Sequence, residues 1–246
     1  MAVKVTFVGC GDAFGAGGRF QTCFLIDAPG LRVALDFGAS SLVALNRLNL
    51  AHNSIDAVVL THIHGDHCGG LPFMLMDAML GAKRTTPLTI AGPVDTQARL
   101  AHIANALLPG IETMTPKFLV DYVEMETLRE HSVRGMKIKT FPADHTKATN
   151  PTAVRIEIGG KVIAYTGDGD WTEHTPALAD GADLLIAECY FYSRHIRFHL
   201  NYPTIEERRH LLRAKRLVLT HMAADMLDHA GSVPEEKAHD GLVIEL

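Results

Sequence analysis

Short apolar runs rich in Val, Ile and Phe recur along the whole chain, and turn residues follow each of them. Runs such as "VKVTFV", "RVALDF" and "IDAVVLT" have the length and the β-branched content typical of strands. The early runs follow one another directly, whereas segments with helical spacing, such as "PVDTQARLAHIANALL", separate the later ones. This order predicts an α/β (α+β) fold in which two mixed sheets pack together with helices outside, a four-layer αββα sandwich.

Two local patterns make this expectation more specific. The stretch "RIEIGGKVIAY" reads as a hairpin with Gly159 and Gly160 as its two-residue turn. In "TIEERRHLLRA", Thr204 stands three residues before Glu207, which predicts a helix that opens with a capping box. No linker or repeat divides the chain, so we expect residues 1–246 to form a single domain.

The stretch "LTHIHGDHCGG" brings four potential metal ligands directly after the strand-like run "IDAVVL". Alternation along an extended backbone makes His62 and His64 project the same way. The glycine that follows lets the chain turn, so that Asp66 and His67 face a second point. This spacing suits two metal ions a few ångströms apart. The alternative is a surface loop that happens to be rich in histidine.

Three other apolar runs also end in a potential ligand. His145 follows "IKTFPA", Asp168 follows "VIAYTG" and His221 follows "RLVLT". A single histidine after a strand is more often structural. In an α/β sheet, however, ligands collect outside the carboxyl ends of the strands, so the recurrence favours one shared site.

This set of residues resembles the signature of the metallo-β-lactamase superfamily. The motif His-x-His-x-Asp-His stands here at residues 62–67, and the later His, Asp and His follow in the family's order. The resemblance implies a metallo-β-lactamase fold with a dinuclear metal site. One metal would be held by His62, His64 and His145. The other would be held by Asp66, His67 and His221, and Asp168 would bridge the two metals.

The donor set bears on which metals are expected. Histidine and aspartate ligands suit two Zn²⁺ ions, although Mn²⁺ or Fe²⁺ binds the same atoms. Iron-dependent redox relatives have an acidic residue at the position of His64, so the histidine favours hydrolysis. The resemblance then implies a metal-bridging hydroxide, available at neutral pH, that attacks phosphorus or a carbonyl carbon. Asp66 would accept a proton as well as bind metal, and Asp36 would support the ligand histidines.

Glu188 and His199 resemble a Glu/His pair of the phosphodiesterase branch, to which ribonuclease Z belongs. His199, polarised by Glu188, would donate a proton to the leaving oxygen. The alternative is a structural histidine in a loop. Only 22 residues (146–167) separate His145 from Asp168, too few for the long arm with which ribonuclease Z grips transfer RNA. A net charge of −5 also argues against transfer RNA.

These observations favour a dinuclear metal-dependent hydrolase acting on a small-molecule or nucleotide phosphodiester: a cyclic nucleotide, a small diester or an RNA 3′ end. One alternative is a hydrolase of a carboxylic bond in a thioester, lactone or lactam. Another is a non-catalytic metal-binding protein, although every ligand position is filled.

Four scattered cysteines, the lack of a signal-peptide pattern and the lack of a membrane-spanning run predict a cytoplasmic protein without membrane attachment. Relatives in this branch are often dimers, so a homodimer stays open.

Overall fold

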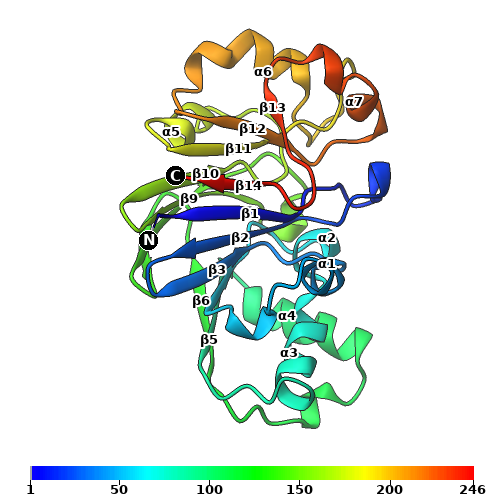
Figure 1. Cartoon of the computed structure of the whole chain (residues 1–246), viewed down its shortest axis with the longest axis vertical. Helices are drawn as coiled ribbons and strands as arrows, with labels where there is room; N and C mark the ends of the chain where they lie inside the picture. The colour runs from blue at the N-terminus through cyan, green and yellow to red at the C-terminus, as the bar shows by residue number, and fades with distance from the viewer. Residues whose placement is uncertain (1) are drawn as a thin grey trace.

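Two seven-stranded sheets pack face to face, and helices cover the outer face of each sheet (Figure 1). The structure is a computed structural model, and it describes residues 2–246. The four layers confirm the αββα sandwich expected from the sequence.

The first sheet has the strand order β14-β1-β2-β3-β4-β5-β6. Its strands are β1 (Lys4–Gly9), β2 (Cys23–Ala28), β3 (Leu31–Leu35), β4 (Ala57–Val59), β5 (Leu88–Pro93), β6 (Val120–Met125) and β14 (Val243–Glu245). Neighbours from β14 to β3 are antiparallel, and those from β3 to β6 are parallel.

The second sheet has the strand order β13-β12-β11-β10-β9-β8-β7. Its strands are β7 (Glu130–Val133), β8 (Met136–Pro142), β9 (Thr152–Ile158), β10 (Lys161–Tyr165), β11 (Leu184–Glu188), β12 (Leu217–Thr220) and β13 (Glu236–Lys237). The predicted hairpin is confirmed: β9 and β10 are antiparallel, and Gly159 (φ 57°) and Gly160 (φ 76°) form the turn. Both turn residues have the positive φ that a tight hairpin of this kind requires.

Side-chain alternation explains how one strand can support two layers. In β2, Phe24 and Ile26 are buried between the sheets, whereas Cys23 and Leu25 are buried under the helices. The Phe24 ring meets the Tyr165 ring of the opposite sheet edge-on, with centroids 5.1 Å apart. Strands covered on both faces are apolar at nearly every position, as the sequence of this strand is.

Four helices cover the first sheet: α1 (Ser41–Arg47), α2 (Gly65–Cys68), α3 (Leu71–Leu80) and α4 (Thr96–Leu107). Three cover the second: α5 (Thr175–Ala179), α6 (Tyr202–Arg208) and α7 (Ala224–Asp228). No helix within residues 2–246 is both long and apolar enough to cross a membrane.

Helix α6 corrects the predicted capping box. The helix begins at Tyr202, and its N-cap is Asn201, whose side chain accepts a hydrogen bond from the backbone N–H of Thr204 at 3.0 Å. Thr204 is therefore inside the first turn. Asparagine is as good a cap as threonine, and the proline at position 203 suits the first turn because it needs no hydrogen-bonded N–H.

The two ends of the described chain meet at one strand pair. Strand β14 pairs with β1, and Asp240 precedes β14. The Asp240 carboxylate accepts hydrogen bonds from the backbone N–H of Cys10 at 3.1 Å and of Phe20 at 2.8 Å. These two residues bracket the glycine-rich loop after β1, so the C-terminal segment holds the base of that loop.

Buried Arg84 is expected to be one of the strongest stabilising residues of the helical layer over the first sheet. Its guanidinium group donates to backbone carbonyls of Asn53, Ile55, Thr86 and Pro87 at 2.7–3.0 Å. Replacing Arg84 with methionine keeps much of the volume but leaves buried carbonyls unpaired. We expect the free energy of unfolding to fall by about 3 kcal/mol or more, measured by chemical denaturation.

Arg129 supplies the control, because its side chain is exposed and pairs with the exposed side chain of Glu126. The Arg129→Met variant should unfold within about 1 kcal/mol of the wild type. Equal unfolding midpoints for the Arg84→Met and wild-type proteins would contradict the structural role.

Candidate metal centre

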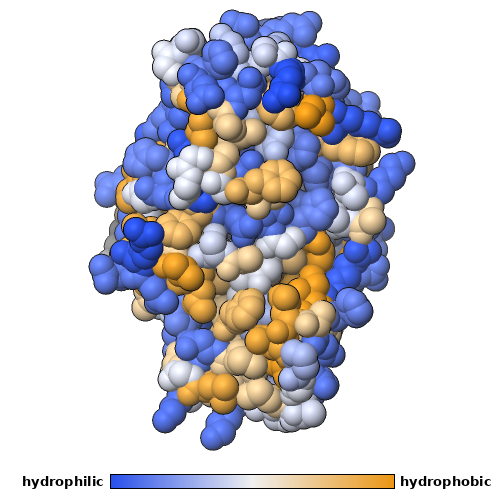
Figure 2. Space-filling model, turned by 90° about the vertical axis from the view of Figure 1, so that its right-hand side faces the viewer, coloured by the Kyte–Doolittle hydropathy of each residue, from blue (hydrophilic) through white to orange (hydrophobic). Residues whose placement is uncertain are grey.

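The carboxyl ends of the parallel strands meet at one edge of the sandwich, on the right in Figure 1, where the short helix α2 follows β4. Figure 2 looks onto this edge: hydrophilic side chains gather near its centre, and hydrophobic ones are concentrated in its lower half. All the ligands expected from the sequence lie in loops at this edge or in α2.

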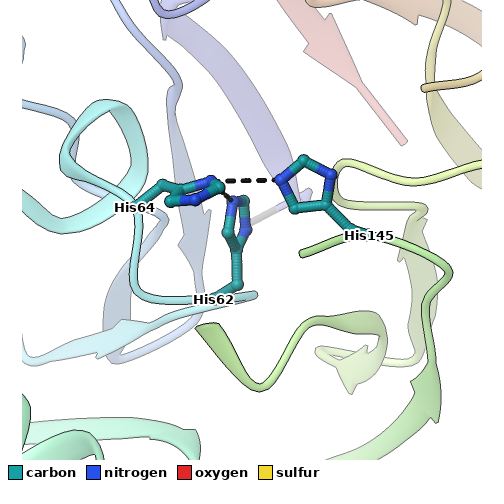
Figure 3. A group of neighbouring side chains, drawn as sticks. All are labelled: His62, His64 and His145. Atoms are coloured by element: carbon teal, nitrogen blue, oxygen red, sulfur yellow. Dashed lines mark hydrogen bonds between the residues drawn. The ribbon is translucent and has the colours of Figure 1, made fainter. Parts of the chain in front are cut away.

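The first group of ligands consists of three histidines from two loops. Nε2 of His62 and Nε2 of His145 each lie 3.1 Å from Nδ1 of His64, so three ring nitrogens face one point (Figure 3). His62 and His64 come from the loop after β4, and His145 comes from the loop after β8. The structure thus brings together the three residues expected to hold one metal.

The second group adds two carboxylates to two histidines. Asp66, His67, Asp168 and His221 offer ligand atoms that all lie within 4.8 Å of one another. Asp168 Oδ1 lies 3.2 Å from His67 Nε2, and Asp168 Oδ2 lies 3.2 Å from His221 Nε2. The same Oδ2 is 4.0 Å from His62 Nε2 of the first group. Asp168 therefore lies where a bridging ligand would have to lie.

Asp36 orients one histidine of each group, His67 directly and His62 through Thr61, on the side of the rings away from the centre. Its carboxylate accepts hydrogen bonds from His67 Nδ1 at 2.7 Å and from the backbone N–H and hydroxyl of Thr61 at 2.8 Å. The Thr61 hydroxyl in turn lies 3.0 Å from His62 Nδ1. With Nδ1 engaged, Nε2 of each histidine is directed at the centre, which is the usual arrangement for a metal-binding imidazole.

His145 and His221 are held at Nδ1 in the same way, whereas His64 turns its Nδ1 toward the centre. His145 Nδ1 donates to the carbonyl oxygen of Phe198 at 2.9 Å, and His221 Nδ1 lies 3.4 Å from the Thr22 hydroxyl. Phe198 (φ 76°) and His221 (φ 55°) adopt the left-handed backbone conformation, which is costly for residues with a side chain. The backbone N–H of His221 donates to Cys10 at 3.1 Å, which holds this strained ligand in place.

The loop after β3 packs tightly against α2. The backbone N–H of Phe37 donates to the His67 carbonyl at 2.6 Å, and that of Ala39 donates to Gly65 at 3.2 Å. A Cβ atom on Gly38 would lie 2.2 Å from the Asp66 carbonyl oxygen, so only glycine permits this approach. This loop therefore braces the helix that carries Asp66 and His67.

Burial sets the protonation of the first group. It lowers the pKa values of His62, His64 and His145 below the ordinary histidine range, so these imidazoles are neutral at neutral pH. Burial opposes protonation of His67 as well, but the carboxylates of Asp168 and Asp66 outweigh it and raise its pKa well above the ordinary value. His67 must therefore lose a proton when a cation binds.

The buried polar atoms of the second group fit a divalent cation. His67 Nε2 and Asp168 Oδ1 are buried and make no hydrogen bond within residues 2–246. The two atoms lie 3.2 Å apart without forming a hydrogen bond, and a buried nitrogen and oxygen so placed are the donors that Zn²⁺ takes. The residues present thus match the cation that the sequence motif implies.

A second feature of the edge is the pair formed by Glu188 and His199. Glu188, the last residue of β11, is fully buried, and its Oε1 accepts a hydrogen bond from His199 Nδ1 at 2.6 Å. Its Oε2 accepts from the backbone N–H groups of Gly169 at 2.9 Å and Leu200 at 3.1 Å. Burial opposes protonation of His199, but the hydrogen bond to Glu188 raises the pKa of His199 above its ordinary value.

These contacts bear on whether the pair could bind metal or donate a proton. Asp168, Glu188, His199 and His221 also offer ligand atoms within 4.8 Å of one another. Both oxygens of Glu188 are already engaged, however, and His199 has only Nε2 left to offer. The pair therefore fits a proton donor better than a further metal site.

Several supporting residues were not anticipated from the sequence, namely Thr61, Thr22 and the carbonyl of Phe198. One signal was available: the tripeptide Leu-Thr-His occurs twice, at residues 60–62 and 219–221, each time with a ligand histidine after a strand. In both places the threonine hydroxyl lies against a neighbouring loop, at Asp36 for Thr61 and at the Cys10 carbonyl for Thr220.

Zinc is expected to stabilise the metal-free protein, because a cation that binds only the folded state shifts the folding equilibrium. One ion at 100 times its Kd adds about 2.7 kcal/mol. For a chain of this length, that raises the Tm by roughly 5–10 °C, measured by differential scanning calorimetry. Protons compete with the cation for His67, so the rise should be larger at pH 8 than at pH 6.

The Asp168→Asn variant is the control, since it keeps the shape of the side chain and removes its charge. Its Tm should respond less to zinc than that of the wild type. Melting curves of the wild type that are identical with and without zinc would argue against a metal centre.

Comparison with known proteins agrees with this geometry. The profile of the family described as Anti-Pycsar protein Apyc1 matches residues 3–243. The ribonuclease Z of Clostridium beijerinckii is 36% identical over 108 residues, which are 43% of this chain and 35% of that protein. The chain spans from 28% to 51% of the length of the first three ribonuclease Z relatives.

Solved structures share the fold. The metallo-β-lactamase fold protein YhfI from Bacillus subtilis has a TM-score of 0.78 and 24% identity, and all of both chains is covered. The short form of human tRNase Z has a TM-score of 0.76 and 24% identity, with 98% of each chain covered. The expected fold and the position near the ribonuclease Z branch are confirmed.

Proposed function

This chain belongs to the family described as Anti-Pycsar protein Apyc1, and on that premise we propose that it is a metal-dependent hydrolase of small phosphodiesters. Cyclic nucleotides, other small diesters and RNA 3′ ends are the proposed substrates. The observation that carries the proposal is the hydrogen-bonded Glu188–His199 pair beside two groups of metal ligands. A phosphodiester with a poor leaving group needs such a proton donor.

The metal ions proposed are two Zn²⁺. His62, His64 and His145 would hold one, and Asp66, His67 and His221 the other, with Asp168 between them. Divalent cations at these positions would supply Lewis acidity, which neutralises charge on phosphoryl oxygens and lowers the pKa of water.

The chain's own residues would move the protons. Burial alone would raise the pKa of Asp66, but His67 outweighs it and holds the pKa well below the usual range, so Asp66 is a carboxylate at neutral pH. In that form it would accept a hydrogen bond from the attacking water and take up its proton, as a weaker base than an ordinary aspartate. His199 would give the proton on Nε2 to the oxygen that leaves phosphorus. Glu188 would stabilise the charged form of His199 until that proton is transferred.

The alternative is hydrolysis of a carboxylic bond. Lactones and lactams release an oxygen or a nitrogen that also takes up a proton, so the pair does not discriminate against them, whereas a thioester gains less from it. A thiolate leaves without a proton, so His199 would have no task with a thioester.

Transfer RNA is also disfavoured as a substrate, because the segment between His145 and Asp168 is short. It consists of a 3-10 turn, the hairpin strands β9 and β10 and their connecting loops. This leaves no arm there to hold a large RNA.

The test is a substrate panel on the metal-replete protein. Bis(p-nitrophenyl) phosphate, the 3′,5′-cyclic nucleotides and a short RNA would be compared with an aryl thioester and a lactone. The expected result is metal-dependent cleavage of the diesters at higher kcat/KM than of the carboxylic compounds. Turnover of the thioester or lactone alone would sink the phosphodiesterase proposal.

A homodimer is also proposed, through the exposed apolar side chains of α3. Phe73 and Leu80 are 41% and 58% exposed on this helix. Light scattering after size exclusion would report a dimer for the wild type and a monomer for Leu80→Glu, and a monomeric wild type would end this proposal. Localisation in the cytoplasm stays a prediction from the sequence.

A further inference from the structure

Tyr190 lies beside both the proton-donating pair and the metal ligands. Its ring stacks on the imidazole of His199, with centroids 4.5 Å apart and planes inclined by 26°. The same ring lies 5.9 Å from the imidazole of His221. No role for this residue follows from the sequence motifs, yet it touches the group that would donate the proton.

The backbone fixes the place of this ring. The Tyr190 N–H donates to the Leu200 carbonyl at 2.8 Å, and the Tyr190 carbonyl accepts from the N–H of Ala223 at 3.0 Å. One bond ties Tyr190 to the segment that carries His199, and the other ties it to the segment that follows His221. Phe191 packs edge-on against the ring at 4.6 Å. The stacking surface is therefore held from several sides.

The imidazole of His199 needs a second restraint. The hydrogen bond to Glu188 fixes Nδ1, but rotation of the ring about that bond would swing Nε2 away from the substrate. His145 meets the ring only edge-on, at 5.1 Å and 73°. Contact with the flat face of Tyr190 restrains the plane of the ring. Alignment of the donor with the leaving oxygen is what makes proton transfer efficient.

We infer that Tyr190 is a positioning residue, whose aromatic face holds the His199 imidazole in the plane from which Nε2 reaches the leaving oxygen. This inference rests on the proposed function, since it requires His199 to be the proton donor. The contact is made by the ring face, which phenylalanine would also present. Leucine has a similar bulk without a flat face.

The experiment compares leaving groups. The wild type, Tyr190→Phe and Tyr190→Leu would be assayed with bis(p-nitrophenyl) phosphate, which needs little protonation to leave, and with diphenyl phosphate, which needs more. We expect kcat of Tyr190→Leu on diphenyl phosphate to fall about 10- to 100-fold. The change on bis(p-nitrophenyl) phosphate should be much smaller, and Tyr190→Phe should behave as the wild type. Metal content and Tm, measured for each variant, separate loss of positioning from loss of the fold.

A double-mutant cycle completes the test. In the His199→Asn background, Tyr190→Leu should cause no further loss, because the donor that it positions is gone. A Tyr190→Leu variant with the leaving-group dependence of the wild type would overturn the inference, as would equal losses in Tyr190→Phe and Tyr190→Leu. If His199→Asn itself leaves that dependence unchanged, the proposed proton donor is wrong. The two failures are thus distinguishable.

Discussion

Replacing Asp168 with alanine is expected to lower metal-dependent turnover of bis(p-nitrophenyl) phosphate by roughly 10³-fold or more. The Asp168 carboxylate reaches both ligand groups, at 3.2 Å from His67 Nε2 and 4.0 Å from His62 Nε2. Its loss leaves the second group with one carboxylate instead of two. We therefore expect the variant to hold less metal as well as to turn over more slowly.

Metal content by elemental analysis and kcat/KM would be measured on the same samples. Asp180→Ala is the matched control, since Asp180 is exposed and pairs with Arg213 at 3.0 Å away from the centre. The control should keep both the metal and the rate. An Asp168→Ala variant with wild-type metal content and turnover would remove the central assumption about the site.

Replacing His199 with asparagine is expected to give the second largest loss, about 10²- to 10⁴-fold in kcat on substrates with poor leaving groups. The asparagine amide can still donate to Glu188 from the position of Nδ1, so the buried carboxylate stays paired. What disappears is the proton on Nε2. The loss should be small with bis(p-nitrophenyl) phosphate and large with diphenyl phosphate or a cyclic nucleotide.

Glu188→Gln tests the same pair from the other side. Glutamine keeps the size of the side chain but cannot stabilise a charged imidazole, so the pKa of His199 should fall toward the ordinary histidine range or below it. Activity on poor leaving groups would then be lost at lower pH than in the wild type.

For the His199→Asn variant, equal losses of activity on both kinds of leaving group would point to a structural histidine instead of a proton donor.

Much of the centre could be predicted from the sequence because its ligands follow buried strands. Strand-like runs are read from composition and length, and the carboxyl ends of parallel strands meet at one edge whatever the loops do. His145, Asp168 and His221 could therefore be assigned to one site although they lie far apart in the chain. Their ligand roles remain predictions that the metal measurements above would test.

Other features could not be predicted, for physical reasons that differ between them. Strand β7 has the polar sequence "EHSV" and lies at the edge of its sheet, so it lacks the apolar pattern of a covered strand. The N-cap of α6 is Asn201 rather than Thr204. Both residue types cap helices well and the two lie close together in the chain, so the choice between them depends on tertiary packing.

The neighbours of the ligands were the least accessible to sequence reasoning. Tyr190 meets His199 because the chain folds back between them and pairs Phe191 with Asn201. The path of the chain between Tyr190 and His199 depends on residues such as Phe198. Its left-handed backbone conformation cannot be predicted from amino-acid composition. Contacts across an irregular loop have no periodicity from which to read them.

The pairing of β14 with β1 has a consequence for the order in which the protein folds during its synthesis. Strand β14 is synthesised long after β1, so one edge of β1 stays unpaired while the strands between them are made. Asp240, which holds the loop beside Cys10, also arrives late, and the strained ligand His221 depends on the Cys10 carbonyl. A nascent chain therefore has every strand of the second sheet before Asp240 can fix the Cys10 loop that supports His221. We therefore expect the proposed hydrolytic activity to appear only after β14 has paired with β1 and Asp240 has fixed the Cys10 loop.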